Sequence, residues 1–310
     1  MIDTASGMDM GRPERAITRR KLAVGAAFFA ASAASGQRAF AEMRARDKTI
    51  DTHAHVFHRG LKLASGRRYA PDYDAPLELY LKQLDDNGIS NGVLVQPSFL
   101  GTDNSYLIES LKSAGGRLRG IAVVDPAVSA EEIKSLDLAG VVGIRLNLVG
   151  QPLPDLSAPE WQALLANVRA ADWQIEIQRN AADLALLVPK LLDRGVHVVL
   201  DHYALPDPRL GVSDPAFAEI LKLGAFRDVW IKISAPYRNG ANGEVFAKQA
   251  YPLLRNAYGL DRLLWGSDWP HTQFEAGQTY AKNRHFLDEL VTAPDERASI
   301  LASPEALFRF

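Results

Sequence analysis

The segment DTHAH at residues 51–55 places His53 and His55 one residue apart, in a chain of 310 residues with only seven histidines. Imidazoles can bind a metal ion or donate hydrogen bonds to a developing oxyanion. Much later, the segment GSDWPH contains Asp268, and a carboxylate can take a proton from water as a general base. By itself, the histidine pair is also compatible with a chance pair on a surface loop, so the remaining pattern of the chain has to decide.

The elements that must position these residues follow a regular pattern from residue 48 onward. Short segments rich in Val, Ile and Leu alternate with longer segments of helical periodicity, which is typical of parallel βαβ units. Eight such units in about 260 residues predict a closed (β/α)8 TIM barrel. A doubly wound open sheet is the alternative, but its first turn is usually Gly-rich, and DTHAHVFHRG is not. The expected strands are residues 49–53, 92–96, 119–124, 141–146, 174–178, 197–201, 229–233 and 262–266.

Polar residues stand at or just after the ends of most of these strands. Active sites of the barrel fold lie at the carboxyl ends of the strands, so we expect these side chains to converge on one rim. The set comprises His53, His55, Gln96, Ser98, Arg145, Asn147, Gln178, Asp201, His202, Ser234, Tyr237, Arg238, Ser267 and Asp268.

Side-chain alternation in strands refines this set. It predicts that Asp51, His53 and His55 share one face of the first strand. It also predicts that His202 shares a face with Val198 and Leu200, while His197 points toward the helices as a packed structural residue.

Four ordered motifs resemble the amidohydrolase-related (amidohydrolase 2) barrel hydrolases: DTHAH, GIRLN, VVLDH and LLWGSDWPH. The segments VQPSFLGTDN and RGIAVVDPA are similar to the branch that contains 2-pyrone-4,6-dicarboxylate lactonase. The resemblance spans about residues 49–273. It implies a lactone-opening hydrolase in which His53, His55, His202 and Asp268 are catalytic: Asp268 activates water, and the imidazoles polarise the carbonyl.

The same four residues could complete a mononuclear site for a divalent metal, with zinc the first expectation. Arg145 and Gln178 stand where many barrel amidohydrolases have further ligands, and arginine stays protonated. This argues against a binuclear centre. The resemblance also implies that some members of the branch work without metal, so either no cofactor or one metal ion is expected.

The resemblance implies substrate contacts for Tyr69, Ser98, Arg145 and Arg238, with Gln178 in place of a tyrosine. Two arginines of the lactonase pattern are absent, one after GIRLN and one after Asp201-His202. Losing them should disfavour a dianion by several kcal/mol, at roughly 1.5–3 kcal/mol per charged hydrogen bond. We therefore expect a small lactone or related ester with one carboxylate, or with hydroxyls in place of the second.

Two alternatives remain open at the level of sequence. One is a metal-dependent decarboxylase of the same superfamily, which usually has an additional late histidine; His271 is the weak candidate here. The other is a non-catalytic exported binding protein on a degenerate barrel.

Composition and the first 41 residues concern location and partners. The formal charge is −2 and cysteine is absent, so nothing indicates nucleic acid, and disulfides and thiol chemistry are excluded. Residues 12–21 hold a basic cluster with the pair Arg19-Arg20, followed by an apolar run too short to span a bilayer and an Ala-Phe-Ala cleavage site. We expect residues 1–41 to be a twin-arginine signal peptide, recognised by that export machinery. Residues 42–310 would then be a periplasmic barrel domain with no membrane span.

Overall fold

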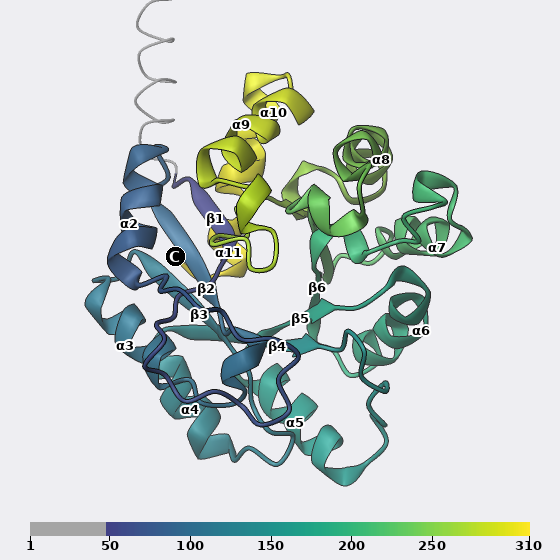
Figure 1. Cartoon of the computed structure of the whole chain (residues 1–310). Coiled ribbons are helices and arrows are strands. Elements are labelled where there is room, and N and C mark those ends of the chain that lie inside the picture. Colours follow the sequence, from purple (N-terminus) through teal and green to yellow (C-terminus); the bar gives the residue numbers. More distant parts are fainter. Residues whose placement is uncertain (1–47) are drawn as a thin grey trace, which may run out of the picture. The chain divides into compact units, whose positions relative to one another are not determined.

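The computed structural model describes residues 48–310, which form one compact unit. The expected signal peptide lies outside these residues. Eight parallel strands follow one another in sequence order around a barrel, with helices outside them (Figure 1). The strands are β1 (Ile50–Ala54), β2 (Asn91–Val95), β3 (Leu118–Ala122), β4 (Val141–Asn147), β5 (Gln174–Gln178), β6 (His197–Leu200), β7 (Val229–Lys232) and β8 (Leu263–Leu264).

The barrel closes where the short strand β8 meets β1. The backbone N–H of Thr52 donates to the carbonyl of Trp265 at 3.0 Å, and that of His55 donates to Trp269 at 2.7 Å. Ala54 and Trp269 also form a parallel bridge. The predicted (β/α)8 barrel is therefore confirmed.

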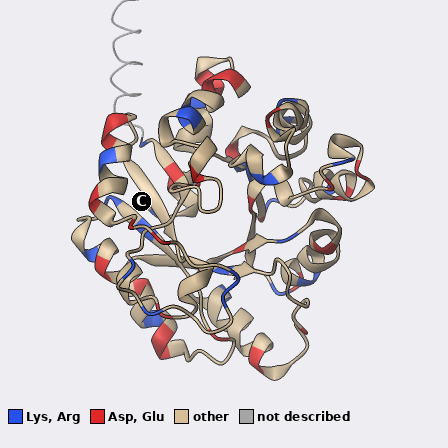
Figure 2. Cartoon of the chain, in the orientation of Figure 1, with Lys and Arg blue, Asp and Glu red and all other residues tan. Residues whose placement is uncertain are grey.

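Each strand is followed by a helix that covers the outside of the barrel. The helices are α2 (Leu77–Asp86), α3 (Ser105–Ser113), α4 (Ala130–Leu138), α5 (Pro159–Ala170), α6 (Ala181–Leu192), α7 (Pro215–Leu223), α8 (Gly243–Tyr258), α9 (Tyr280–Leu290), α10 (Pro294–Ala302) and α11 (Pro304–Leu307). Within residues 48–310, none of them is both long and apolar enough to cross a bilayer. Acidic and basic positions are mixed along the outer helices (Figure 2).

Helix starts are encoded by local capping residues. Ser129 accepts a hydrogen bond from the N–H of Glu132 at the start of α4, and Asn180 accepts one from Asp183 at the start of α6. Such side chains satisfy backbone donors that have no partner within the helix, and each stabilises the helix by about 1 kcal/mol.

Two apolar layers hold the strands in place. The larger layer lies between the barrel and the helices, and the smaller one fills the barrel interior. Strand β2 shows the alternation, because Leu94 belongs to the outer layer while Val93 and Val95 belong to the inner one. The inner layer consists of Ile50, Val93, Val95, Ile121, Val142, Val199, Leu264 and Phe308.

Candidate active site

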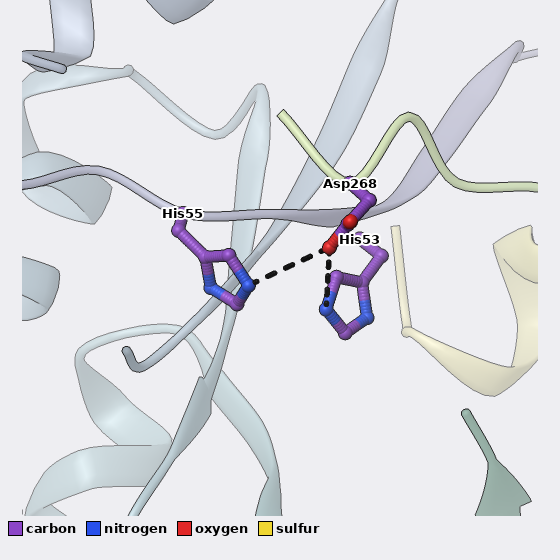
Figure 3. Close-up of side chains that lie close together, drawn as sticks. All are labelled: His53, His55 and Asp268. Atoms are coloured by element: carbon purple, nitrogen blue, oxygen red, sulfur yellow. Dashed lines mark ion pairs between the residues drawn. The ribbon is translucent and has the colours of Figure 1, made fainter. Parts of the chain in front are cut away.

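Four side chains predicted to be catalytic meet at one point of the barrel. The Nε2 atoms of His53, His55 and His202 lie 3.8, 3.9 and 3.9 Å from Oδ1 of Asp268. All four residues are buried. Figure 3 shows the imidazoles of His53 and His55 directed toward this carboxylate.

The turn after β8 brings Asp268 close to β1. A Cβ atom on Gly266 would lie 2.6 Å from the Cβ of His53, so only glycine allows this approach. Asp51 then ties the two segments together, because its carboxylate accepts the backbone N–H of Ser267 at 2.8 Å and the Ser267 hydroxyl at 2.6 Å. The N–H of Asp268 itself donates to the carbonyl of His53 at 2.8 Å.

The prediction that Asp51 shares one face of β1 with His53 and His55 is wrong. Its carboxylate accepts a hydrogen bond from Tyr80 of α2, on the outer side of β1. The pairing of β1 with β2 shifts register between Asp51 and Ala54, and this irregularity breaks the regular alternation of faces before His53.

His202 does reach the site, but it does not share a face of β6 with Val198 and Leu200 as predicted. Val199 lies in the inner layer, and Val198 and Leu200 lie in the outer layer. His202 follows the strand with a φ of +51° and begins a run of four left-handed residues that ends at Leu205. This turn redirects the ring of His202 into the barrel.

His197 therefore does not pack toward the helices. It lies on the same face of β6 as Val199, at the opposite end of the strand from His202. Its half-exposed ring contacts Asp172 and Asp228 at 3.4 and 3.0 Å and packs edge-on against Trp230.

Asp268 is ionised, and one of its two oxygens is held firmly. Oδ2 accepts hydrogen bonds from Arg238 Nε at 2.7 Å and from the Tyr237 hydroxyl at 2.6 Å. Burial opposes ionisation, but the Arg238 guanidinium and the nearby imidazoles outweigh it and hold the pKa of Asp268 well below its usual range. Oδ1 has no hydrogen-bond partner among the described residues and faces the three imidazoles.

The histidines are neutral bases in this setting. Burial, reinforced by Arg145, lowers the pKa of His55 to about 3. Burial also lowers the pKa of His202 to about 4, although Asp268 opposes the change. The pKa of His53 lies well below its usual value because of burial and the charge of Lys232. All three can therefore offer a neutral N–H or a lone pair at neutral pH.

A buried charged cluster beneath His53 was missed by the sequence analysis. Nζ of Lys232 lies 2.6 Å from Glu176 Oε2, 2.9 Å from His53 Nδ1 and 3.3 Å from Asp201 Oδ1. All of these side chains are fully buried. The sequence does carry a signal, since single charged residues in the strands QIEIQ and VWIK need partners when buried.

A cavity of about 220 Å³ opens beside this centre. Four of the five residues expected to bind substrate line it: Tyr69, Arg145, Gln178 and Arg238. Ser98, partly buried at the start of a 3-10 turn after β2, is not among the lining residues. The full lining is His55, Arg68, Tyr69, Arg145, Asn147, Val149, Gln178, Leu205, Arg238, Thr272, Gln273 and Phe274.

The arginines of this cavity differ in how their charge is compensated. Arg145 donates to Gln178 at 2.5 Å and lies 3.4 Å from Asp201, and Arg238 pairs with Asp268. Arg68, which the sequence analysis did not select, is exposed and donates to the neutral amide oxygen of Asn147 at 3.2 Å. Arg68 stands on a loop with no periodic pattern, so only the structure could place it.

Two groups of residues within the described chain have ligand atoms spaced for a metal ion: His53 with His55 and Asp268, and His53 with Asp201 and His202. Their donor types suit zinc. Both groups need a ring nitrogen of His53, however, and Nδ1 of that ring faces the Lys232 ammonium. Metal-bound imidazoles usually donate from the second nitrogen to a carboxylate or carbonyl. The carboxylate Oδ1 of Asp201 lies 3.4 Å from this Nδ1 without a hydrogen bond to it, and the Lys232 ammonium is closer, so the surroundings of His53 depart from that pattern.

The family follows from comparison with known proteins. The model of the amidohydrolase family matches residues 50–310, and the chain belongs to this family. The barrel hydrolase indicated by the four sequence motifs is thereby confirmed.

Individual relatives are similar over most of their length. A 2-pyrone-4,6-dicarboxylate hydrolase of Comamonas testosteroni is 33% identical over 72% of this chain and 76% of its own. A 4-sulfomuconolactone hydrolase of Hydrogenophaga intermedia is 27% identical over 72% and 75%. A crystal structure from Acinetobacter baumannii with citric acid bound, named as a probable 2-pyrone-4,6-dicarboxylic acid hydrolase, is 40% identical, with a TM-score of 0.82 over 85% of this chain and all of that one. These relatives support an enzyme that hydrolyses cyclic esters.

Proposed function

We propose that the protein hydrolyses a lactone that bears one carboxylate. The observation that carries this proposal is the environment of Asp268, whose Oδ1 is free to accept a proton while three neutral imidazoles surround it at 3.8–3.9 Å. A base and an oxyanion donor at one point are what acyl transfer to water requires. Lactones are also the substrates in the names of the two relatives described above.

The proposed reaction has two steps. Asp268 takes a proton from a water molecule as the water oxygen bonds to the lactone carbonyl carbon, and an imidazole N–H stabilises the negative charge that develops on the carbonyl oxygen. The ring C–O bond then breaks, and the leaving ring oxygen takes the proton from Asp268. The products are a carboxylic acid and a hydroxyl on one open chain, so atoms and protons balance.

The charges of the cavity support a single carboxylate on the substrate. Arg145 and Arg238 each face a buried carboxylate of the protein, so their charges are already largely compensated. Arg68 is the guanidinium of the lining that faces a neutral amide. One substrate carboxylate between Arg68 and Arg145 would balance the site, whereas a second would be excess charge in a small cavity.

A panel of lactones tests this function. We expect ring opening with release of one proton per turnover, and the highest kcat/KM on a monocarboxylated lactone. Highest activity on a dicarboxylated pyrone would overturn the substrate class. Release of carbon dioxide, or no turnover of any lactone by folded protein, would overturn the reaction.

We also propose that residues 1–41 direct export through the twin-arginine pathway, so that the reaction takes place in the periplasm. The basic pair, the short apolar run and the Ala-Phe-Ala site support this location. Replacing both arginines, Arg19→Lys and Arg20→Lys, should retain the protein in the cytoplasm. Normal export of the double variant in cell fractionation would contradict the pathway.

A further inference from the structure

Lys232 occupies a position in the barrel interior that fixes its hydrogen-bonding role. Its Nζ has three neighbours, Glu176 Oε2, His53 Nδ1 and Asp201 Oδ1, and an ammonium group has three N–H donors and no acceptor. Of these neighbours, Glu176 Oε2 accepts a hydrogen bond from the ammonium and Asp201 Oδ1 forms an ion pair with it. The third neighbour, Nδ1 of His53, lies 2.9 Å from the ammonium and accepts its hydrogen bond, whereas Asp201 Oδ1 lies 3.4 Å from the same nitrogen and makes no hydrogen bond to it.

We propose that Lys232 is a positioning residue that holds His53 with its proton on Nε2, so that His53 acts as a hydrogen-bond donor in the active site and not as a metal ligand. A neutral imidazole carries one ring hydrogen, so a ring whose Nδ1 accepts a hydrogen bond has its hydrogen on Nε2. The catalytic use of this donor rests on the proposed lactone hydrolysis, whereas the position of the proton does not.

His55 has the opposite arrangement. Its Nδ1 lies 2.7 Å from the carbonyl oxygen of Val95, which can only accept, so the proton is on Nδ1 and Nε2 carries a lone pair. The two rings lie edge to face with centroids 5.0 Å apart. One residue apart at the carboxyl end of β1, they therefore present a donor and an acceptor to the same carboxylate oxygen.

This pairing of roles indicates where the attacking water binds. Oδ1 of Asp268 and Nε2 of His55 are both acceptors 3.9 Å apart, and a water molecule with one O–H toward each satisfies both. Its oxygen lone pair is then free to attack the carbonyl carbon. The Nε2–H of His53 is left to stabilise the carbonyl oxygen as its charge develops.

The same proton position explains why His53 is a poor metal ligand. Both groups of described residues with metal-compatible spacing include His53, and both of its nitrogens are committed, one to accepting from Lys232 and the other to its proton. Removing the ammonium would allow the proton to move from Nε2 to Nδ1, and Nε2 could then bind a metal ion. Lys232 thus opposes zinc binding at the site where the ligand types would favour it.

The decisive experiment is the tautomer of His53 in the wild-type protein without substrate. Two-bond ¹H–¹⁵N spectra distinguish protonated from unprotonated ring nitrogens, and His53→Gln assigns the resonances. We expect Nδ1 of His53 to be unprotonated and Nε2 protonated, with the reverse for His55. A proton on Nδ1 of His53 would overturn the proposal and would leave the lactone hydrolysis untouched.

Variants of Lys232 test whether this residue affects turnover and zinc binding through His53. Because Lys232→Met leaves Glu176 buried without its partner, it is compared with the double variant Lys232→Met/Glu176→Gln, which removes both charges. We expect kcat to fall about 10²-fold in both, as for loss of one oxyanion donor, with KM changed less than threefold. Lys232→Gln, which keeps an N–H donor, should retain more activity than Lys232→Met, and zinc should bind the double variant more tightly than the wild type. Unchanged kcat in the folded double variant would refute the positioning role.

Discussion

Arg238 and Asp268 form a buried ion pair in which Nε lies 2.7 Å from Oδ2. The contact fixes one carboxylate oxygen and leaves the other facing the imidazoles, so it orients the base as well as ionising it. The guanidinium is also the largest of the charges that lower the pKa of this carboxyl against the effect of burial.

Replacing Arg238 should move the acid limb of the pH profile. Activity needs the Asp268 carboxylate and neutral imidazoles together, and Arg238 lowers the pKa values of Asp268, His55 and His202 alike. Arg238→Met removes this charge from all three groups, and we expect the acid limb of log(kcat/KM) to rise by about one pH unit or more. An acid limb at the wild-type position would show that Arg238 does not tune this base.

Removing the base itself should abolish most turnover. Asp268→Asn keeps the shape of the side chain but cannot take a proton from water, so we expect kcat to fall by about 10²–10⁴. The matched control is Asp228→Asn, which neutralises an exposed carboxylate near His197 at the other end of β6. Kinetics on the same lactone would contradict the mechanism if the two variants were equally active.

Arg68 should govern recognition of the substrate carboxylate. A lost charge-assisted hydrogen bond costs about 1.5–3 kcal/mol, so Arg68→Gln should raise KM for a carboxylated lactone at least about tenfold, with kcat little changed. Arg67→Gln is the control, because Arg67 is exposed, donates to the carbonyl of Ala64 and does not line the cavity. A neutral lactone should show no difference between the two variants, and equal effects on the anionic one would contradict the role.

Acid should destabilise the fold before the carboxylates titrate. Burial lowers the pKa of His55 to about 3 and those of His202 and His271 to about 4. Between these values and about 6.5 the unfolded chain binds protons that the folded one does not, so the free energy of unfolding falls as the pH falls, by about 1.4 kcal/mol per pH unit for each group. Glu176, whose pKa is raised by burial, acts in the opposite direction.

We therefore expect a net loss on the order of a few kcal/mol between pH 7 and pH 5, measurable by urea unfolding. His202→Gln should reduce this pH dependence, whereas substitution of the exposed His285 should not. A free energy of unfolding that is constant over this range would contradict the neutral state of the buried imidazoles.

Hydrophobic periodicity was enough to predict the barrel, because each strand and each helix has a recognisable local pattern of apolar residues. The strand ends likewise indicated that His53, His55, His202 and Asp268 would meet. The direction of the His202 side chain could not be predicted from the sequence. It depends on a left-handed turn, a conformation that Tyr203 and Ala204 do not favour.

The charged cluster was missed for a different reason. Glu176 and Lys232 are 56 residues apart, and each looks like an isolated exception in an apolar strand. Their pairing becomes clear only in the folded barrel, where β5 and β7 direct both side chains into the same interior. Arg68 was missed because loop residues have no period from which their direction can be inferred.

The division of the site between strands and loops has a practical consequence. Glu176 and Lys232 belong to strands, and His53 is held between them and the turn after β8, whereas Arg68 and Tyr69 come from the long segment between β1 and α2. Exchanging that segment for one with another set of polar groups should redirect the enzyme to other esters without disturbing proton transfer. The strands of the barrel thus supply the ring-opening chemistry, and an exchangeable loop determines which substrate is accepted.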